Sequence, residues 1–140
     1  MNKILLPVDG SASSAQAVAV FIKLLGDYRE MPQIDLINVQ HSLRGDISLF
    51  INQENIRQYH EDEGLKALQP ARDLLDKAGI AYTYHVSVGD PVEAIISHCK
   101  QQGCSQIVIA RHGLGAVAGV LLGSIAHKVI QLAAVPVLVL

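Results

Sequence analysis

The sequence predicts a single α/β domain, in which a five-stranded parallel sheet is covered by helices on both faces. Two observations lead to this fold class. Nearly continuous hydrophobic runs, typical of buried parallel strands, alternate along the chain with segments of helical periodicity. The chain has 140 residues, of which 50% are hydrophobic, and it shows no linker, internal repeat or low-complexity tract. Its length and composition therefore suit one domain with a substantial core.

Each element is predicted from its own local signal. Short hydrophobic runs predict strands, and apolar residues at i, i+3, i+4 and i+7 predict amphipathic helices. Asp90 followed by Pro91 is a typical helix start. Gly26, Gly79 and Gly103 are typical helix stops. The expected strands cover residues 3–8, 34–39, 80–88, 105–110 and 135–140, and the expected helices cover residues 15–25, 54–78, 91–102 and 124–133.

Three segments depart from this simple alternation. Pro70 lies inside the expected helix 54–78, and because proline removes a helix hydrogen bond, we expect a kink or a break near residues 66–69. Apolar and polar residues alternate over residues 80–88, which predicts a strand at the sheet edge with one wetter face. Residues 41–53 are mixed and polar, and we expect a loop that is long enough to form a flap over a site.

Charge and composition exclude several classes of function. The net charge is −2 without a basic block, so neither nucleic acid nor an anionic membrane is an expected partner. No apolar run approaches the length that crosses a bilayer, and no secretory signal is expected. Cys99 and Cys104 are expected to be buried thiols in a reducing cytosol, with a disulfide or a metal pair as the alternative. We therefore expect a cytoplasmic protein.

The sequence shows no pattern typical of a catalytic or metal site. The histidine spacings are not those of metal ligands, and there is no Cys/His cluster. No serine–histidine–aspartate or cysteine–histidine set can be assembled. We therefore expect neither a metal site nor a catalytic residue. Solvated or partly buried side chains are expected for His41, His60, His85, His98, His112 and His127.

The most informative stretch connects strand 105–110 to the last helix. It contains Gly113 and Gly123, and Ser124 opens the helix. Backbone N–H groups at a helix N-terminus are unpaired and favour an anion, and glycines let a ligand approach the backbone closely. The stretch therefore predicts either a phosphate site, to which the Ser124 hydroxyl would contribute, or a surface loop with an ordinary helix cap.

Two other phosphate motifs do not account for this stretch. Residues 113–118 match the loose dinucleotide fingerprint, but the acidic residue that should follow about 20 positions later is missing from residues 133–135. Residues 119–124 superficially resemble a P-loop, but the spacing is short and the lysine is absent. Both motifs are therefore rejected.

These residues resemble the nucleotide-binding pattern of the universal stress protein family, Gly-x2-Gly-x9-Gly-Ser/Thr. Gly113, Gly123 and Ser124 stand at its last three positions. Ala110 stands at the first glycine, so this chain departs from the pattern by one methyl group. The likeness covers the whole chain and extends to residues 3–11, 88–91 and 136–140.

The resemblance implies the remaining details of the fold and of the site. It implies one domain over residues 1–140, a Rossmann-like sheet in strand order 3-2-1-4-5, and a ligand site where the strand order reverses. ATP would bind there, with AMP or ADP as alternative ligands and with Mg²⁺ at the phosphates. Asp9 would either hydrogen-bond the nucleotide or only cap a helix, and Val39 would be a pocket wall or plain core. The expected pocket residues are Pro7, Val8, Asp9, Val39, Ile109, Ala110, Gly113, Gly123, Ser124 and Ile125.

The resemblance also implies a function. We expect an ATP-binding, dimeric stress-response or signalling module, whose homodimer forms through the C-terminal strand, and which is not an enzyme beyond slow ATP hydrolysis. The alternative is a dimeric protein-interaction module of the same fold that binds no nucleotide, and Ala110 is the residue that favours it. An adenylating enzyme of a related fold fits least, because only the serines of residues 9–14 resemble its phosphate loop.

Overall fold

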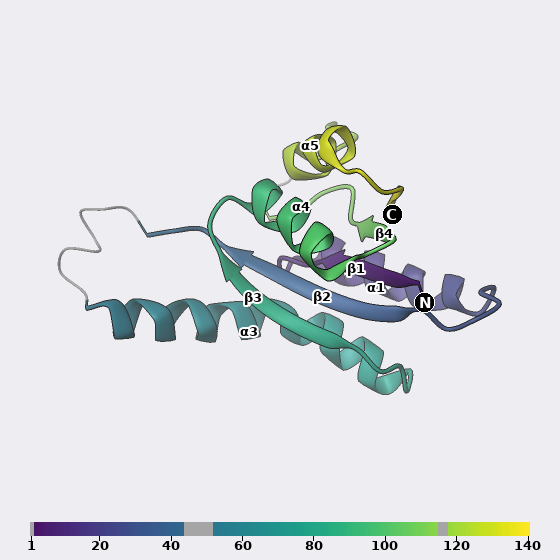
Figure 1. Cartoon of the computed structure of the whole chain (residues 1–140), viewed down its shortest axis with the longest axis horizontal. Helices are drawn as coiled ribbons and strands as arrows, with labels where there is room; N and C mark the ends of the chain where they lie inside the picture. Colours follow the sequence, from purple (N-terminus) through teal and green to yellow (C-terminus); the bar gives the residue numbers. More distant parts are fainter. Residues whose placement is uncertain (1, 44–51, 115–117) are drawn as a thin grey trace.

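The computed structural model describes residues 2–43, 52–114 and 118–140, and within them it confirms the predicted α/β fold. Five parallel strands form one sheet in the order β3-β2-β1-β4-β5, which is the order expected (Figure 1). The strands are β1 (Lys3–Pro7), β2 (Gln33–Gln40), β3 (Thr83–Val88), β4 (Gln106–Ile109) and β5 (Val137–Val139). The helices are α1 (Ala12–Leu25), α3 (Gln53–Lys77), α4 (Pro91–Gln102) and α5 (Ser124–Leu132).

Helices cover both faces of the sheet, and each face has its own hydrophobic core. Successive strand residues point to opposite faces, so Leu6 of β1 packs with α1 and α3 while Leu5 packs with α4 and α5. Both side chains are at most 2% exposed. Burial on two faces explains why the central strands read as continuous hydrophobic runs rather than as an alternation.

Helix α3 runs without interruption from Gln53 to Lys77, so the predicted break near Pro70 is wrong. Proline removes the hydrogen bond to the carbonyl of Lys66 one turn earlier, and Lys66 is exposed, so water can satisfy that carbonyl. Leu68 and Leu75 on either side of the proline are fully buried against the sheet. Packing of both halves therefore outweighs the local cost of the proline.

Strand β3 lies at the edge of the sheet, as the alternation over residues 80–88 predicts. It begins at Thr83 rather than at residue 80. The β2–β3 ladder starts with the pair Asp35 and Thr83, so residues 80–82 have no partner in β2. The last two strands are also shorter than expected. These differences change the ends of the strands and not their order.

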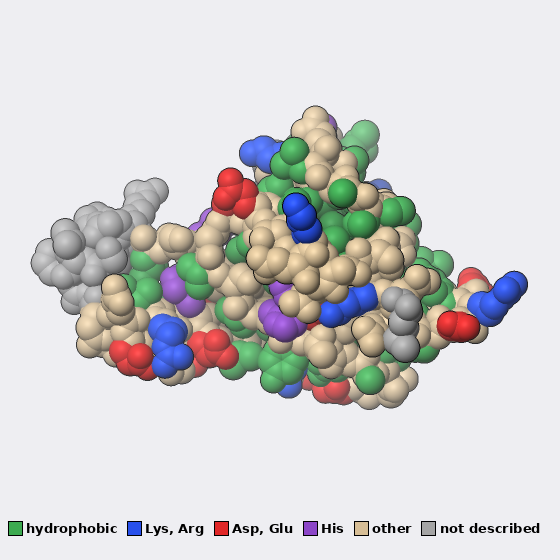
Figure 2. All heavy atoms as spheres, in the orientation of Figure 1, with side chains coloured by type: hydrophobic (Ala, Val, Ile, Leu, Met, Phe, Trp, Pro, Cys, Tyr) green, Lys and Arg blue, Asp and Glu red, His purple; other side chains and the backbone are tan. Residues whose placement is uncertain are grey.

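Several smaller expectations can be compared with the structure. Residues 44–51, the centre of the predicted flap, lie outside the described residues. Cys99 and Cys104 are both buried free thiols, as expected. Among the described residues, no helix is both long and apolar enough to cross a membrane. Figure 2 shows Lys and Arg side chains interspersed with Asp and Glu, without a basic patch on that face.

Candidate functional site

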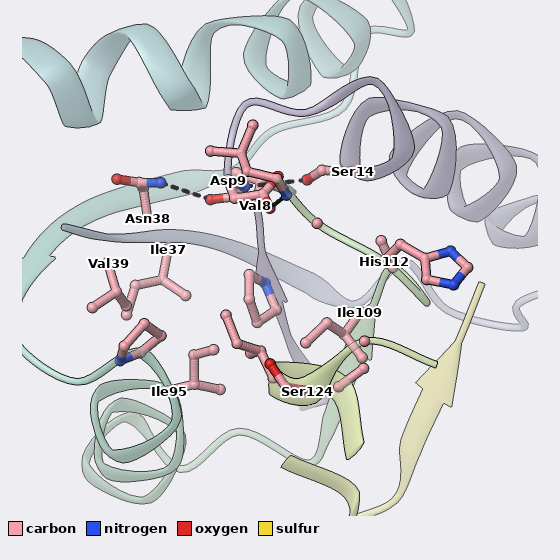
Figure 3. A pocket seen from close by; sticks show the side chains of 18 of the residues that line it. Val8, Asp9, Ser14, Ile37, Asn38, Val39, Ile95, Ile109, His112 and Ser124 are labelled. Carbon is pink, nitrogen blue, oxygen red and sulfur yellow. Dashed lines mark hydrogen bonds between the residues drawn. The ribbon is translucent and has the colours of Figure 1, made fainter. Parts of the chain in front are cut away.

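A cavity of about 520 Å³ opens at the carboxyl ends of β1, β2 and β4, where the strand order reverses (Figure 3). This is the place where parallel α/β sheets bind their ligands, and the volume suits a small organic molecule. All ten residues predicted as pocket residues line it, namely Pro7, Val8, Asp9, Val39, Ile109, Ala110, Gly113, Gly123, Ser124 and Ile125. The fold therefore brings together residues that are more than a hundred positions apart in the sequence.

One side of the cavity is apolar. Pro7 and Ile109 come from the ends of β1 and β4, and Ile37 and Val39 come from β2. Ile95 of α4 lies opposite the sheet (Figure 3). Sequence analysis missed Ile37 and Ile95, because helical and strand periodicity mark a residue as inward without distinguishing core from cavity wall. These side chains form a surface suited to a flat, apolar ring.

Asp9 joins the loop after β1 to the loop after β4. Its carboxylate accepts a hydrogen bond from the Ser11 N–H at 2.9 Å and another from the Leu114 N–H at 2.8 Å. It does not cap α1, because Ser11 is the N-cap and accepts from the Ser14 N–H. The capping role considered for Asp9 is therefore wrong, and its carboxylate lines the cavity.

The two glycines of the loop lie close to other groups of the site. A Cβ on Gly113 would lie 2.2 Å from Oδ2 of Asp9, and a Cβ on Gly123 would lie 3.1 Å from the carbonyl oxygen of Arg111. The Gly123 N–H also donates to that carbonyl. Both glycines therefore hold the loop close to the ends of β1 and β4, where larger residues would displace it.

Helix α5 begins at the cavity. Its N-cap is Gly123, which has no side chain to cap the helix, and Ser124 is its first residue. The capping role considered for Ser124 is therefore wrong, and its hydroxyl is left at the cavity wall. The first N–H groups of a helix have no partner within it, and those of Ser124, Ile125 and Ala126 belong to residues that line the cavity. This end of the cavity can hold an anionic group.

Ala110 is compatible with this geometry. It is 7% exposed, and no described non-glycine residue has a positive φ, so its backbone needs no glycine. The methyl group is therefore accommodated without backbone strain at the end of β4. Sequence alone left this open, because a family glycine can reflect either a positive φ or a close approach to ligand.

Arg111 and His112, which follow β4, also line the cavity. Arg111 is exposed and lines the cavity mouth. The Nε2 atom of His112 is hydrogen-bonded to the carbonyl of Val120, which ties the strand end to the segment before α5. The arrangement as a whole can hold a molecule with a flat apolar part and a negatively charged part.

Comparison with protein families identifies the relatives of this fold. Residues 1–140 match the model of the universal stress protein family. The chain belongs to the universal stress protein family. Universal stress protein YxiE from Bacillus subtilis (strain 168) is 31% identical over 148 residues, which cover 99% of this chain and 97% of that protein.

Solved structures share the universal stress protein fold. The hypothetical protein MJ0577 superposes with a TM-score of 0.82 at 23% identity, covering 99% of this chain and 94% of that one. A universal stress protein in complex with cAMP gives a TM-score of 0.72 at 23% identity, covering 99% and 96%. Protein At3g01520 of Arabidopsis thaliana, with AMP bound, gives 0.71 at 19% identity, covering 100% and 91%. At these identities the comparison establishes the fold alone.

Proposed function

We propose that this universal stress protein binds an adenine nucleotide, ATP in particular, in the cavity at the carboxyl ends of β1 and β4. The observation that carries the proposal is the juxtaposition of an apolar wall with the open N-terminus of α5. Structural neighbours that hold cAMP and AMP support the ligand class. AMP and ADP are the alternative ligands, and Mg²⁺ would accompany the phosphates of ATP.

The shape of the cavity orients the nucleotide. The base lies against Val39 and the other apolar side chains, because burial of a flat ring there removes apolar surface from water. The ribose lies near Asp9, whose carboxylate can accept from a hydroxyl group. The phosphates lie at Gly113, Gly123 and Ser124, where backbone N–H groups and the helix dipole favour negative charge.

The proposed role is binding and signalling in the cytoplasm rather than rapid catalysis. Asp9 is the acidic residue among the described residues that line the cavity, and each of its carboxylate oxygens already accepts a backbone N–H, so neither is free to hold an attacking water. Any hydrolysis of ATP is therefore expected to be slow.

The homodimer is proposed to form through β5. This strand lies at the sheet edge opposite β3, and an uncovered edge offers unpaired backbone groups to a second copy. Ile130 and Leu132 of α5, next to β5, are 44% and 61% exposed in the single chain. Ala126 and Val129 are the buried residues of α5, so Ile130 lies outside the core. An apolar surface of this kind suits a two-fold partner.

Calorimetric titration with ATP, ADP and AMP, each with and without Mg²⁺, tests nucleotide binding. Gly123→Val should abolish it, because its Cβ would lie 3.1 Å from the Arg111 carbonyl oxygen and the branched side chain would displace the loop that forms the phosphate position. Ser124→Ala, which leaves the packing unchanged, should weaken it by several-fold. Gly26→Val, at the remote end of α1, is the matched control. Wild-type affinity in a folded Gly123→Val variant contradicts the site, and a wild type that binds no nucleotide favours the interaction module.

A further inference from the structure

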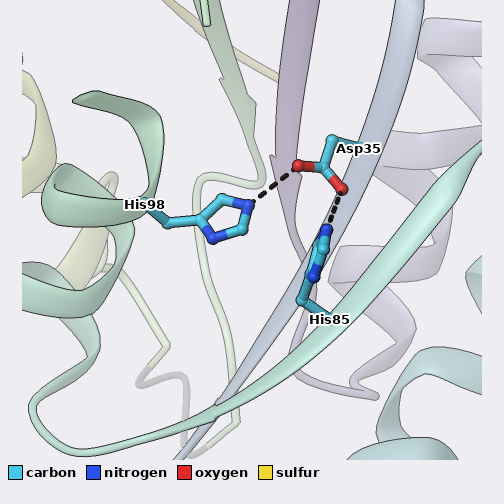
Figure 4. A group of neighbouring side chains, drawn as sticks. All are labelled: Asp35, His85 and His98. Atoms are coloured by element: carbon cyan, nitrogen blue, oxygen red, sulfur yellow. Dashed lines mark hydrogen bonds and ion pairs between the residues drawn. The ribbon is translucent and has the colours of Figure 1, made fainter. Parts of the chain in front are cut away.

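Three side chains converge beneath the cavity, outside the proposed nucleotide site (Figure 4). Asp35 of β2 is 0% exposed. Its Oδ2 atom lies 2.8 Å from Nε2 of His98, and its Oδ1 atom lies 3.0 Å from Nε2 of His85. One donor atom from each of the three residues lies within 4.8 Å of the others. We call these three residues the Asp-His-His cluster.

The register of the sheet creates the cluster. Asp35 pairs with Thr83 across the parallel β2–β3 ladder, so His85, two residues after Thr83, points to the same face as Asp35. Helix α4 packs over that face and contributes His98. Three separate elements thus supply one group each, which no sequence motif could show.

The surroundings of Asp35 call for a cation. Burial of a charged carboxylate is costly unless the charge is paired or coordinates a metal. The Thr83 hydroxyl donates to Oδ1 at 2.7 Å, and the ion pairs described for Asp35 are to the two histidines and not to a lysine or an arginine. A neutral imidazole supplies a hydrogen bond but no positive charge. The positive charge therefore has to come from a protonated histidine or from a bound cation, and a divalent ion held by both imidazoles would supply it.

We propose that the Asp-His-His cluster binds a divalent transition-metal ion, with Zn²⁺ as the reference ion. Two imidazole nitrogens and one carboxylate oxygen are a donor set that Zn²⁺ and its neighbours prefer to Mg²⁺ and Ca²⁺. Ligand atoms about 2.1 Å from a tetrahedral ion are about 3.4 Å apart. The observed nitrogen–oxygen separations of 2.8 and 3.0 Å run to different oxygens of Asp35, and all three ligand atoms already lie within 4.8 Å of one another. Binding one ion would therefore require shifts of roughly half an ångström or more in the side chains.

The Asp-His-His cluster can be reached from solvent, and its carboxylate is held in place by a hydrogen bond. The His85 side chain is 41% exposed on the edge strand, and the His98 side chain is 12% exposed, so an ion can enter from solvent and keep a water as its fourth ligand. The Thr83 hydroxyl donates to Oδ1 of Asp35, and a hydrogen bond of this kind to a ligating carboxylate is a usual way in which proteins orient it. The ion would fasten α4 to β2 and β3.

Titration of chelator-treated full-length protein with Zn²⁺ tests the proposal, by calorimetry and by competition with a chromophoric chelator. The wild type should bind one ion with saturable, micromolar or tighter affinity and should melt at a higher temperature with the ion. His85→Gln and His98→Gln should each lower the affinity by more than about tenfold, because removal of a partner that only orients a ligand already costs about that much. His127→Gln, on the exposed side of α5, is the control and should bind as the wild type does.

The thiols require a second control, because Cys99 and Cys104 can also bind Zn²⁺. The double variant Cys99→Ala/Cys104→Ala should retain the affinity, and Co²⁺ should give visible bands of a nitrogen–oxygen site without sulfur charge transfer. His85→Gln lies on the edge strand and should fold, as circular dichroism can verify. The proposal is overturned if the wild type shows no saturable binding, if both histidine variants bind normally, or if the thiol variant alone loses the ion. Nucleotide titration does not enter this test, so the two proposals fail or succeed separately.

Discussion

A Cβ on Gly113 would lie 2.2 Å from Oδ2 of Asp9, well inside van der Waals contact. The same oxygen accepts the Leu114 N–H at 2.8 Å. The glycine is therefore the residue that lets the β4 loop come close enough to be bonded by the carboxylate at the end of β1. The hydrogen bond between Leu114 and Asp9 joins two residues of the cavity lining in the protein without ligand.

Gly113→Ala should displace the Asp9 carboxylate and break its bond with the Leu114 N–H. This hydrogen bond is exposed to solvent, so its loss should lower the free energy of unfolding by about 0.5–1.5 kcal/mol, and the shifted loop should weaken nucleotide binding. Urea unfolding and calorimetric titration measure the two effects. Gly26→Ala, the same change at the C-cap of α1 where φ is −61°, is the control. Unchanged ATP affinity in Gly113→Ala would show that the loop does not shape the site.

Ala110→Gly should leave nucleotide affinity unchanged or raise it, because it removes a methyl group at the cavity without altering the φ requirement. It should lower the free energy of unfolding by about 0.5–1 kcal/mol, because glycine loses more backbone entropy on folding. Parallel calorimetry and urea unfolding of the two proteins separate these outcomes. A clear fall in affinity with an intact fold contradicts the assignment of this position.

Val139→Asp should shift the protein from a dimer to monomer or aggregate. Pairing of two copies of β5 would bring the two aspartates near the two-fold axis, where like charges repel. Ultracentrifugation over the micromolar range measures the change, and Val20→Asp on the exposed face of α1 is the control. A wild type whose mass is that of a monomer at all concentrations disproves the interface.

Stability should fall in alkaline solution because of Cys104. Burial raises the pKa of its thiol from 9.0 to about 11. Between pH 9 and 11 the folded protein therefore keeps the thiol proton while the unfolded chain releases it. The contribution of the buried thiol to the free energy of unfolding is complete below about pH 8 and is lost as the pH rises through this window. Urea unfolding at pH 8 and pH 10 measures the loss. Cys104→Ala should show a smaller loss, and an equal loss in both proteins would refute the attribution.

Much of the fold and cavity could be predicted from the sequence, because the determining signals are local. The continuous hydrophobic runs mark strands that are buried on both faces, and Asp90 does cap α4, where it accepts the Glu93 N–H. Gly113 and Gly123 marked the loop because glycine is used where the backbone must pack closely. Pro70 gave the wrong prediction because its local signal opposes the helix. The packing of α3 on the sheet, which stabilises the helix, involves residues far apart in the sequence.

The remaining features depend on the register between strands and on whether an inward-facing residue lies in the core or at the cavity. Neither can be read from the sequence. Ile37 and Ile95 look like core residues in any periodicity plot, and only the fold places them at the cavity. His85 and His98 are 13 positions apart and belong to different elements, so their meeting on Asp35 follows from the β2–β3 pairing and the position of α4. The expectation of no metal site rested on spacing along the chain, and it remains untested.

Helix α4 carries Ile95 at the cavity and His98 at the Asp-His-His cluster, less than one helical turn apart. Strand β2 repeats the arrangement, with Ile37 at the cavity and Asp35 at the cluster. The same helix and the same strand thus carry residues of the cavity wall and ligands of the Asp-His-His cluster. Thermodynamic reciprocity then sets a strict condition: whatever factor an ion at the cluster imposes on nucleotide affinity, the nucleotide must impose on ion affinity.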